Sequence, residues 1–310
     1  MVPVPRDRTT FLLVSLPDAE AHPSGAIIDW LNFTFPMQRT LSDLFALVWE
    51  YMGSKFGPAT ERRTGFHFYE RSFDLSDTGA KFAFGGNAGT GLISLSGEAC
   101  YLITDWSRVV ELGRDVLGGQ ISRTDPARDD YLGVHSVDDA LQLYRDGLFG
   151  AGGRRPRMKQ YGNWDSPDGT GRSIVIGSRI NGKRLEVYEK GMQLGALSHP
   201  WVRWEACLGN TGRKIPWEVL LEPGRYLAGA YPKALGWVST EASRIVTLQK
   251  QTQISYDALV GHASRHYGAL IALMQQVEGS PEKVVEKLTR PGTPRRLQHP
   301  AIERPAEWLE

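Results

Sequence analysis

The stretch SIVIGSRINGKRLEVYEK, residues 173–190, consists of two strand-like runs separated by Asn181-Gly182. An Asn-Gly pair favours a two-residue type I′ turn, because both central positions of that turn need a positive φ. A hairpin with this turn would pair Ile180 with Lys183 and continue the pairing outward. Since successive side chains of a strand point to opposite faces, the stretch predicts a β-hairpin with two chemically different faces.

One predicted face is apolar and is expected to pack on a core: Ile174, Ile176, Ile180, Leu185 and Val187. The other face is polar, and Gly177 would leave an open space on it opposite Glu186: Arg179, Arg184, Glu186, Tyr188 and Lys190. An ordinary amphipathic hairpin with a solvated outer face has the same alternation. A tyrosine flanked by cations on a rigid strand also suits phosphoryl transfer, because cations neutralise charge on a phosphodiester and help a phenol to lose its proton. Both interpretations are compatible with the pattern.

Similar strand-like runs recur from Gly25 onward, with helical stretches inserted at residues 40–57, 105–119 and 136–150, and the pattern becomes wholly helical after Thr240. Strands that arrive as hairpins, with helices between groups of them, predict an α+β fold built on antiparallel sheet, with a helical C-terminal part. The expected organisation is a flexible arm at 1–25, an α+β domain at 26–236, a helical subdomain at 237–289 and an extended, basic, proline-rich tail at 290–310.

Composition limits the class of protein. At 310 residues the chain can bury a core without cross-links, and its only cysteines, Cys100 and Cys207, lie far apart in sequence. It contains neither an apolar run of membrane-spanning length nor a signal-peptide pattern. These features predict a soluble cytoplasmic protein that does not interact with membranes.

Positive charge is clustered, although the net charge is only +1. The segment GRRPRMK carries Arg154, Arg155, Arg157 and Lys159, and TRPGTPRR carries Arg290, Arg295 and Arg296. Taken alone, each cluster is better interpreted as a solvated loop or tail, and contact with nucleic acid is the alternative.

Several blocks in order resemble the replication initiation factor family, which includes rolling-circle plasmid initiators, relaxases of integrative elements and initiators of filamentous phages. The resemblance is greatest to phage-type members without an N-terminal helix-turn-helix domain. The blocks are IDWLNFTF (28–35), GGNAGTGLISLSGEAC (85–100), SRTDPARDDYLG (122–133), IGSRINGKRLEVYEKGMQLG (176–195), WVRWE (201–205), IPWEVLLEPGRYLAGAYP (215–232) and EGSPEKVVEKL (278–288).

The resemblance implies a DNA-nicking and joining enzyme that works with the replication machinery of a bacterial host, including its helicase and polymerase. Tyr188 would attack the scissile phosphate at the origin, remain linked to the 5′ end and release a 3′-hydroxyl. Lys190, Arg179 and Arg184 would be its charge partners. The family uses a divalent metal ion without a paired-histidine motif, and this chain contains no His-x-His. Plasmid members imply a homodimer.

Carboxylates that could hold Mg²⁺ or Mn²⁺ lie in three strand-like blocks, because such hard cations prefer oxygen ligands. Asp125 and Glu205 are the first candidates, followed by Glu186 and Asp129. Each could instead belong to an arginine–carboxylate pair on the surface of a sheet. The residues expected to contact DNA are Arg123, Arg154, Arg155, Arg157, Lys159 and Arg203.

Two residues depart from the family pattern. Pro126 follows Asp125 where an apolar residue is usual, and a proline inside a strand implies an edge or a bulge. Glu186 stands where the family has an arginine. Two functional classes therefore remain open: a nickase, or a catalytically weakened origin-binding or regulatory protein of the same fold. A relaxase of an integrative element is the further alternative.

Two other features have simpler interpretations. GGNAGTG, residues 85–91, lacks the Lys-Ser/Thr of a phosphate-binding loop and predicts a glycine-rich turn between strands, close to DNA backbone. Tyr226, Tyr231 and Tyr267 compete with Tyr188 as nucleophiles. Tyr188 is favoured because a strand holds a side chain more rigidly.

Overall fold

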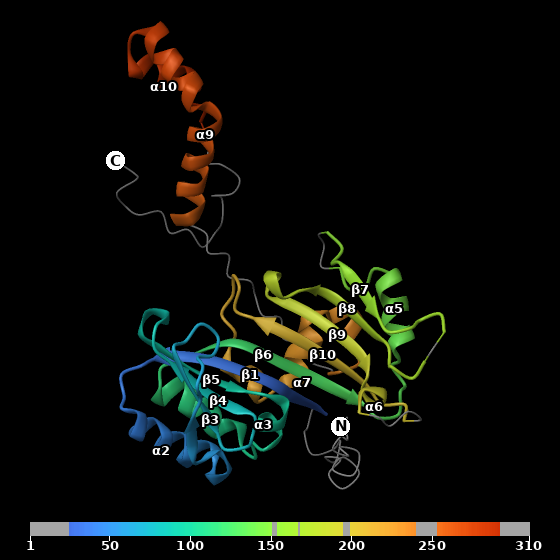
Figure 1. The fold of residues 1–310 in the computed structure, drawn as a ribbon. Helices are drawn as coiled ribbons and strands as arrows, with labels where there is room; N and C mark the ends of the chain where they lie inside the picture. Colours follow the sequence, from blue (N-terminus) through green and yellow to red (C-terminus); the bar gives the residue numbers. More distant parts are fainter. Residues whose placement is uncertain (1–24, 151–153, 167, 195–198, 240–252, 292–310) are drawn as a thin grey trace, which may run out of the picture. The chain divides into compact units, whose positions relative to one another are not determined.

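A computed structural model describes residues 25–150, 154–166, 168–194, 199–239 and 253–291 (Figure 1). The chain divides into two compact units, Met1–Thr247 and Leu248–Glu310. Residues 1–24 of the expected arm and 292–310 of the expected tail lie outside the described residues. So do residues 240–252, which contain the division between the units.

The first unit is built on one antiparallel sheet, which contains ten strands within the described residues. The order is β2-β3-β4-β5-β1-β6-β10-β9-β8-β7, so β1 and β6 lie near the centre and the edges are β2 and β7. This confirms the predicted α+β fold. The strands are β1 (Ala26–Pro36), β2 (Ala59–Glu61), β3 (Arg71–Leu75), β4 (Ala80–Phe84), β5 (Thr90–Leu95), β6 (Gln120–Asp130), β7 (Met158–Tyr161), β8 (Ser173–Ser178), β9 (Lys183–Glu189) and β10 (Val202–Gly209).

Helices connect the strands, and several begin at a side chain that caps the first turn. The Thr40 side chain accepts a hydrogen bond from the Asp43 amide, and Ser136 forms a capping box with Asp139. The helices of this unit are α2 (Leu41–Met52), α3 (Gly97–Tyr101), α4 (Trp106–Val110) with its π-helical continuation η3 (Glu111–Val116), α5 (Val137–Arg145), α6 (Lys190–Gln193), α7 (Pro223–Ala230) and α8 (Pro232–Leu235), with short 3₁₀ turns η1 (Ser54–Phe56), η2 (Asn87–Gly89), η4 (Arg179–Asn181) and η5 (Trp217–Leu220).

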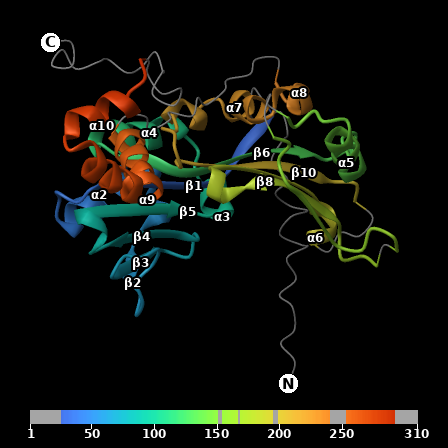
Figure 2. The same ribbon diagram turned by 90° about the horizontal axis from the view of Figure 1, so that it is seen from above.

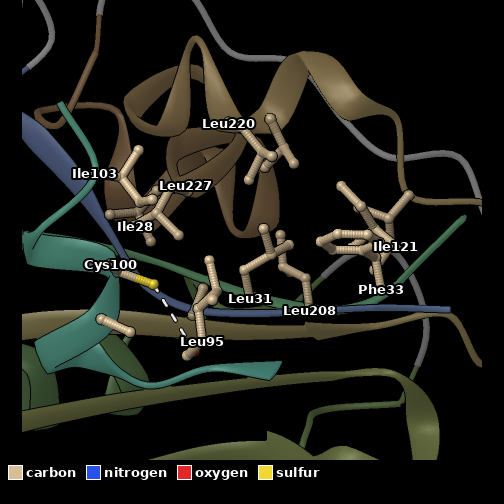
Figure 3. Close-up of a cluster of buried hydrophobic side chains, with 14 of the residues drawn as sticks. Ile28, Leu31, Phe33, Leu95, Cys100, Ile103, Ile121, Leu208, Leu220 and Leu227 are labelled. Carbon is tan, nitrogen blue, oxygen red and sulfur yellow. Dashed lines mark hydrogen bonds between the residues drawn. The ribbon is translucent and has the colours of Figure 1, made fainter. Parts of the chain in front are cut away.

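One face of the sheet is apolar and covered by helices. Figure 2 shows α7 and α8 along this face, and Figure 3 shows side chains of η5 and α7 packed over β1, β6 and β10. Trp204 is fully buried at the centre, and its indole N–H donates to the His135 carbonyl (2.9 Å). On the other half of the sheet, Phe45 of α2 packs edge-on against Phe73 and Phe82. Burial of this face is the main stabilising contribution to the fold.

A β-bulge interrupts β1 at its pairing with β6. Ile28 pairs with Pro126 and Trp30 with Asp125, so Asp29 is the extra residue. Pro126 has no N–H for the ladder and yet lies in a central strand, which is tolerated at a bulge. Of the two alternatives that the sequence gives for Pro126, edge or bulge, the structure has the bulge.

The hairpin of residues 173–190 forms, but its predicted turn and register are wrong. Ser178 pairs with Lys183 and Gly177 with Arg184, so four residues form the loop. Within it η4 ends at Gly182, whose φ is 69°, while Asn181 needs no positive φ. The apolar face keeps Ile174, Ile176, Leu185 and Val187, all fully buried, but loses Ile180, which is 83% exposed.

Gly177 does not leave an open space on the polar face. Its φ is 89°, and a Cβ at this position would approach the Lys183 carbonyl oxygen at 2.7 Å and the Tyr231 hydroxyl at 2.9 Å. Glycine is therefore required by backbone conformation and close packing.

The second unit contains α9 (Gln253–Glu278) and α10 (Pro281–Leu288) among its described residues. Ser280 caps α10 by accepting a hydrogen bond from the Lys283 amide. None of the helices in the described ranges combines the length and apolarity needed to span a membrane.

The corrected register can be tested with a matched pair of substitutions. Ile176→Ala removes fully buried methyl groups and should lower the free energy of unfolding by about 2–5 kcal/mol. Ile180→Ala, at the exposed loop, should change it by less than about 0.5 kcal/mol. Urea denaturation measures both, and comparable losses would support the two-residue turn instead.

Candidate active site on the open face of the sheet

The polar face of the sheet is formed by residues in register on five neighbouring strands. Asp129, Arg203, Tyr188 and Ser173 occupy one row across β6, β10, β9 and β8. The next row contains Ala127, Glu205, Glu186, Val175 and, on β7, Lys159. We call this surface the open face. Antiparallel pairing therefore gathers side chains from distant segments of the sequence.

Arg203 is at the centre of the open face and is only 7% exposed. Its Nε and Nη2 donate to the two Asp129 carboxylate oxygens, each at 2.7 Å, and its Nη1 donates to Asp29 Oδ1 at 2.5 Å. The bulge at Asp29 brings that carboxylate within reach. Trp201 also donates its indole N–H to Asp129 (2.7 Å). This network joins β1, β6 and β10 by charge-assisted hydrogen bonds.

A second pair lies farther along β6. The Arg123 guanidinium binds Asp125 through two parallel hydrogen bonds, and Asp125 is 1% exposed. Arg123 also stacks over the Trp30 ring, with 4.7 Å between its Cζ and the ring centroid. Burial and the Asp125 charge raise the pKa of the neighbouring Cys207 thiol to about 11, so this thiol stays protonated at neutral pH.

Tyr188 of β9 pairs with Arg203 of β10 and lines a cleft on the open face. Its hydroxyl donates to Glu205 Oε2 at 3.1 Å. Burial, followed by the negative charges of Asp29 and Asp125, raises the pKa of Glu205 to about 7. Burial and the Glu205 charge raise the pKa of Tyr188 above its usual range. The phenol is therefore protonated at rest and in contact with a carboxylate that can change its charge near neutral pH.

Tyr188 and Glu205 line a polar cleft of about 360 Å³. Arg179 reaches this cleft from the loop η4, while Arg184 and Glu186 come from β9 and form an ion pair at 2.8 Å. Lys190 is the first residue of α6, and its Nζ lies 5.4 Å from the centroid of the Tyr188 ring. Burial and the Arg203 charge lower the pKa of Lys190. All four predicted catalytic residues therefore lie at or next to one cleft.

The four predicted metal ligands are on the same face, but three of them are paired with arginine. Asp125 binds Arg123, Asp129 binds Arg203 and Glu186 binds Arg184, whereas Glu205 accepts from Tyr188. Among the residues that the structure describes, no three His, Cys, Asp or Glu side chains form a group that could hold a metal ion.

The predicted DNA-contacting cations differ in accessibility. Lys159 lies on the open face at the edge strand β7, in register with Val175. Arg154 is exposed, and Arg155 donates to the Arg145 carbonyl (2.9 Å) while lying over the Tyr144 ring. Arg157 precedes β7 and accepts a backbone hydrogen bond from Gly177. Arg123 is part-buried and Arg203 is buried, so both mainly neutralise carboxylates.

The family model for "Replication initiation factor" matches residues 119–289, which is more than half of the chain. This chain belongs to the replication initiation factor family. The matched region includes β6, β9 and β10, which carry the Tyr188–Glu205 contact and the Arg203–Asp129 pair, while Asp29 of β1 lies outside it.

The fold of this initiation factor is also found in a solved structure, described as "Structure of Rolling Circle Replication Initiator Protein from Geobacillus stearothermophilus". The TM-score is 0.54 at 16% sequence identity, with coverage of 72% of this chain and 98% of that chain. No curated protein sequence matches.

Two residues of the initiation factor's site were not predicted from the sequence. The apolar residues of β1 change from even to odd positions between Ile28 and Leu31, which is the signal of a bulge. Asp29 was missed because strict strand alternation does not allow for such a change. Arg172, which also lines the cleft, binds Glu189 (2.8 Å) and Asp138 (3.0 Å), and it lies in a glycine-rich stretch without a periodic signal.

The raised pKa of Glu205 predicts a pH-dependent stability. Below about pH 4.5 Glu205 is protonated in both folded and unfolded states; between 4.5 and 7 only the unfolded state ionises, so stability falls as pH rises. Glu205→Gln lacks this penalty, which amounts to roughly 3 kcal/mol at 1.36 kcal/mol per pKa unit. The variant should gain stability relative to the wild type across this window in urea titrations. Parallel curves for the two proteins would contradict the assignment.

Proposed function

We propose that this initiation factor is a rolling-circle initiator that nicks and rejoins one strand of an origin through Tyr188. The observation that carries the proposal is the Tyr188–Glu205 hydrogen bond (3.1 Å) inside a cleft lined by Arg179 and Arg184. The fold shared with the Geobacillus stearothermophilus rolling-circle initiator supports it.

In the proposed reaction, the Tyr188 hydroxyl oxygen attacks the phosphorus of the scissile phosphodiester. The new bond joins the tyrosine oxygen to phosphorus, and the bond from phosphorus to the 3′-oxygen breaks. The products are a 5′-phosphotyrosine and a 3′-hydroxyl that a polymerase can extend. Joining is the reverse, in which a 3′-hydroxyl attacks the phosphotyrosine and regenerates the phenol.

Glu205 would accept the phenol proton as the new bond forms. Because the pKa of Tyr188 is raised, the phenol is not ionised before the attack. Transfer of its proton to a neighbouring base during the attack means that no free phenolate has to form. Glu205 Oε2 is already at hydrogen-bond distance, and a pKa of about 7 leaves a large ionised fraction at neutral pH. Arg179 and Arg184 would stabilise the charge that develops on the phosphate oxygens.

A divalent cation, Mg²⁺ or Mn²⁺, is part of the proposal because of the charge balance on the open face. Four carboxylates, Asp29, Asp125, Asp129 and Glu205, face two guanidinium groups and the Lys190 ammonium. The negative charges that raise the pKa of Glu205 would also repel a phosphate, and oxygen donors suit a hard cation. Glu205, which has no arginine partner, would hold the ion together with phosphate oxygens of the substrate and water, and the ion would supply charge neutralisation for the phosphodiester.

A weakened, DNA-binding form of the same protein is the second candidate. The Arg184–Glu186 ion pair (2.8 Å) favours it, because it cancels a positive charge inside the cleft where a phosphate would lie. Pro126 does not favour it, since the bulge accommodates the proline and brings Asp29 into the network.

The nicking step is tested on supercoiled origin DNA with Mg²⁺ or Mn²⁺. The wild type should convert the plasmid to open circles and form a covalent protein–DNA adduct. Tyr188→Phe should abolish both, because it removes the attacking oxygen but retains the ring. Tyr226→Phe, in α7, is the matched control and should behave as the wild type. Binding without nicking in both metals would exclude the enzyme and leave the second candidate.

The metal ion is tested by thermal denaturation, independently of activity. A cation that binds the folded state should raise the Tm of the wild type as its concentration passes the Kd. Glu205→Gln should lose this shift, whereas Glu186→Gln, on the neighbouring strand, should retain it. Equal shifts in all three proteins would place the ion elsewhere.

A further inference from the structure

A strained hairpin arm, residues 62–70, connects β2 to β3. Phe66 and Tyr69 exchange both backbone hydrogen bonds, with N–O distances of 3.2 and 3.0 Å, so His67 and Phe68 are the two central residues of a tight turn. Their φ values are 50° and 69°. Such turns usually contain Asn and Gly, because bulky side chains disfavour the left-handed region. Two bulky residues held in this conformation indicate a role outside stability.

The arm is firmly attached to the sheet. Tyr69 is 6% exposed and packs with Ala83 and Leu92, and its hydroxyl shares a 2.8 Å hydrogen bond with Thr90. A Cβ on Gly65 would lie 1.9 Å from the Tyr69 carbonyl oxygen, so the chain passes itself too closely for any other residue. The tip is therefore rigid relative to the sheet.

The attachment lies on the open face. Leu92 pairs with Thr34, and two residues away along these strands Ser94 pairs with Asn32, which pairs with Arg123. Partners in register share a face, as do residues two apart along a strand, so the Tyr69 anchor and Arg123 lie on the same side.

The tip projects an aromatic side chain beside the charged groups. Phe68 is 96% exposed, and the Phe66 and His67 rings pack edge-on with centroids 4.3 Å apart. Burial, followed by the Arg123 charge, lowers the pKa of His67, in agreement with the register that places the anchor of the arm on the same face as Arg123. Arg63 is an exposed cation on the arm, whereas Arg62 pairs with Asp74 (3.5 Å).

The glycine-rich segment of residues 85–89 supports this tip. The Asn87 side-chain amide donates to the His67 carbonyl (3.4 Å), and the Glu70 amide donates to the Gly85 carbonyl (3.1 Å). Asn87 and Ala88 also have positive φ values, 42° and 54°. This segment is the predicted glycine-rich turn between strands, and it supports the arm through these two hydrogen bonds.

We propose that Phe68 is a stacking platform for an unpaired base of single-stranded DNA that enters the open face beside Arg123. An exposed aromatic ring next to cations is the combination that binds unpaired bases, since the ring stacks on the base and the cations contact the backbone. The inference rests on the proposed function, to which it adds a defined contact with the DNA strand.

The test measures binding of single-stranded DNA in the Tyr188→Phe background, where no cleavage occurs. The probe is a mixed-sequence oligonucleotide of about 16 nucleotides with 2-aminopurine placed at each position in turn. Phe68→Ala should weaken binding about five- to 150-fold, as expected for loss of one stacked base, and should abolish the quenching of 2-aminopurine at one or two adjacent positions. Phe68→Trp should retain both properties.

Two controls separate stacking from general damage. Trp49→Ala removes another exposed aromatic ring, which is 58% exposed and belongs to α2, the helix on the apolar side of the sheet. This variant should bind as the Tyr188→Phe parent does. Phe68→Gly relieves the left-handed strain, so its Tm should rise while its affinity for single strands falls.

Unchanged affinity in Phe68→Ala, or an equal loss for single strands and fully paired duplex, would overturn the platform. An equal loss would point to contact with the DNA backbone. The outcome is separable from the proposed chemistry. If the wild type never nicks but Phe68→Ala loses single-strand binding, the proposal for Phe68 is supported and the proposed nicking function is contradicted. If the wild type forms the Tyr188 adduct but Phe68→Ala binds single strands as before, the nicking function is supported and the proposal for Phe68 is contradicted.

Discussion

The buried guanidinium of Arg203 is the constraint on which the site depends. It joins Asp129 of β6 to the bulged Asp29 of β1 while belonging to β10, so one side chain links three strands. Removing one partner of such a network leaves uncompensated buried charge, which typically costs about 3–5 kcal/mol. Arg203 also pairs in register with Tyr188, and Glu205 lies two residues farther along the same strand. The ion pairs of Arg203 therefore fix the position of the contact between the Tyr188 phenol and the Glu205 carboxylate.

The alternation of apolar and polar residues predicted much of this arrangement. It placed Arg184, Glu186 and Tyr188 on one side of β9 and Leu185 and Val187 on the other, because a strand has a period of two whatever its turn. The turn itself could not be predicted from Asn181-Gly182. Only Gly182 needs a positive φ in the four-residue loop, and the Ser178 hydroxyl accepts from the Ile180 amide to shape the rest.

Other features depend on contacts between segments far apart in sequence. A sequence shows that Asp125 and Arg123 share a face, but not that they bind each other tightly enough to compete with a metal ion. Asp29 was hidden by the bulge, and the proximity of His67 to Arg123 arises only once the arm folds over β4 and β5. Electrostatic roles in a buried cluster are set by three-dimensional neighbours, so residue type alone cannot assign them.

These observations describe a replication initiation factor whose sheet has two functions: one face stabilises the fold, and the other presents Tyr188, cations and an aromatic arm. Mapping the covalently modified residue by mass spectrometry, after reaction with origin DNA and nuclease digestion, tests this account most directly. Trypsin releases Leu185–Lys190, in which Tyr188 is the only tyrosine. The account predicts a nucleotide phosphate on this peptide. A modification on the peptides that contain Tyr226, Tyr231 or Tyr267 would contradict it.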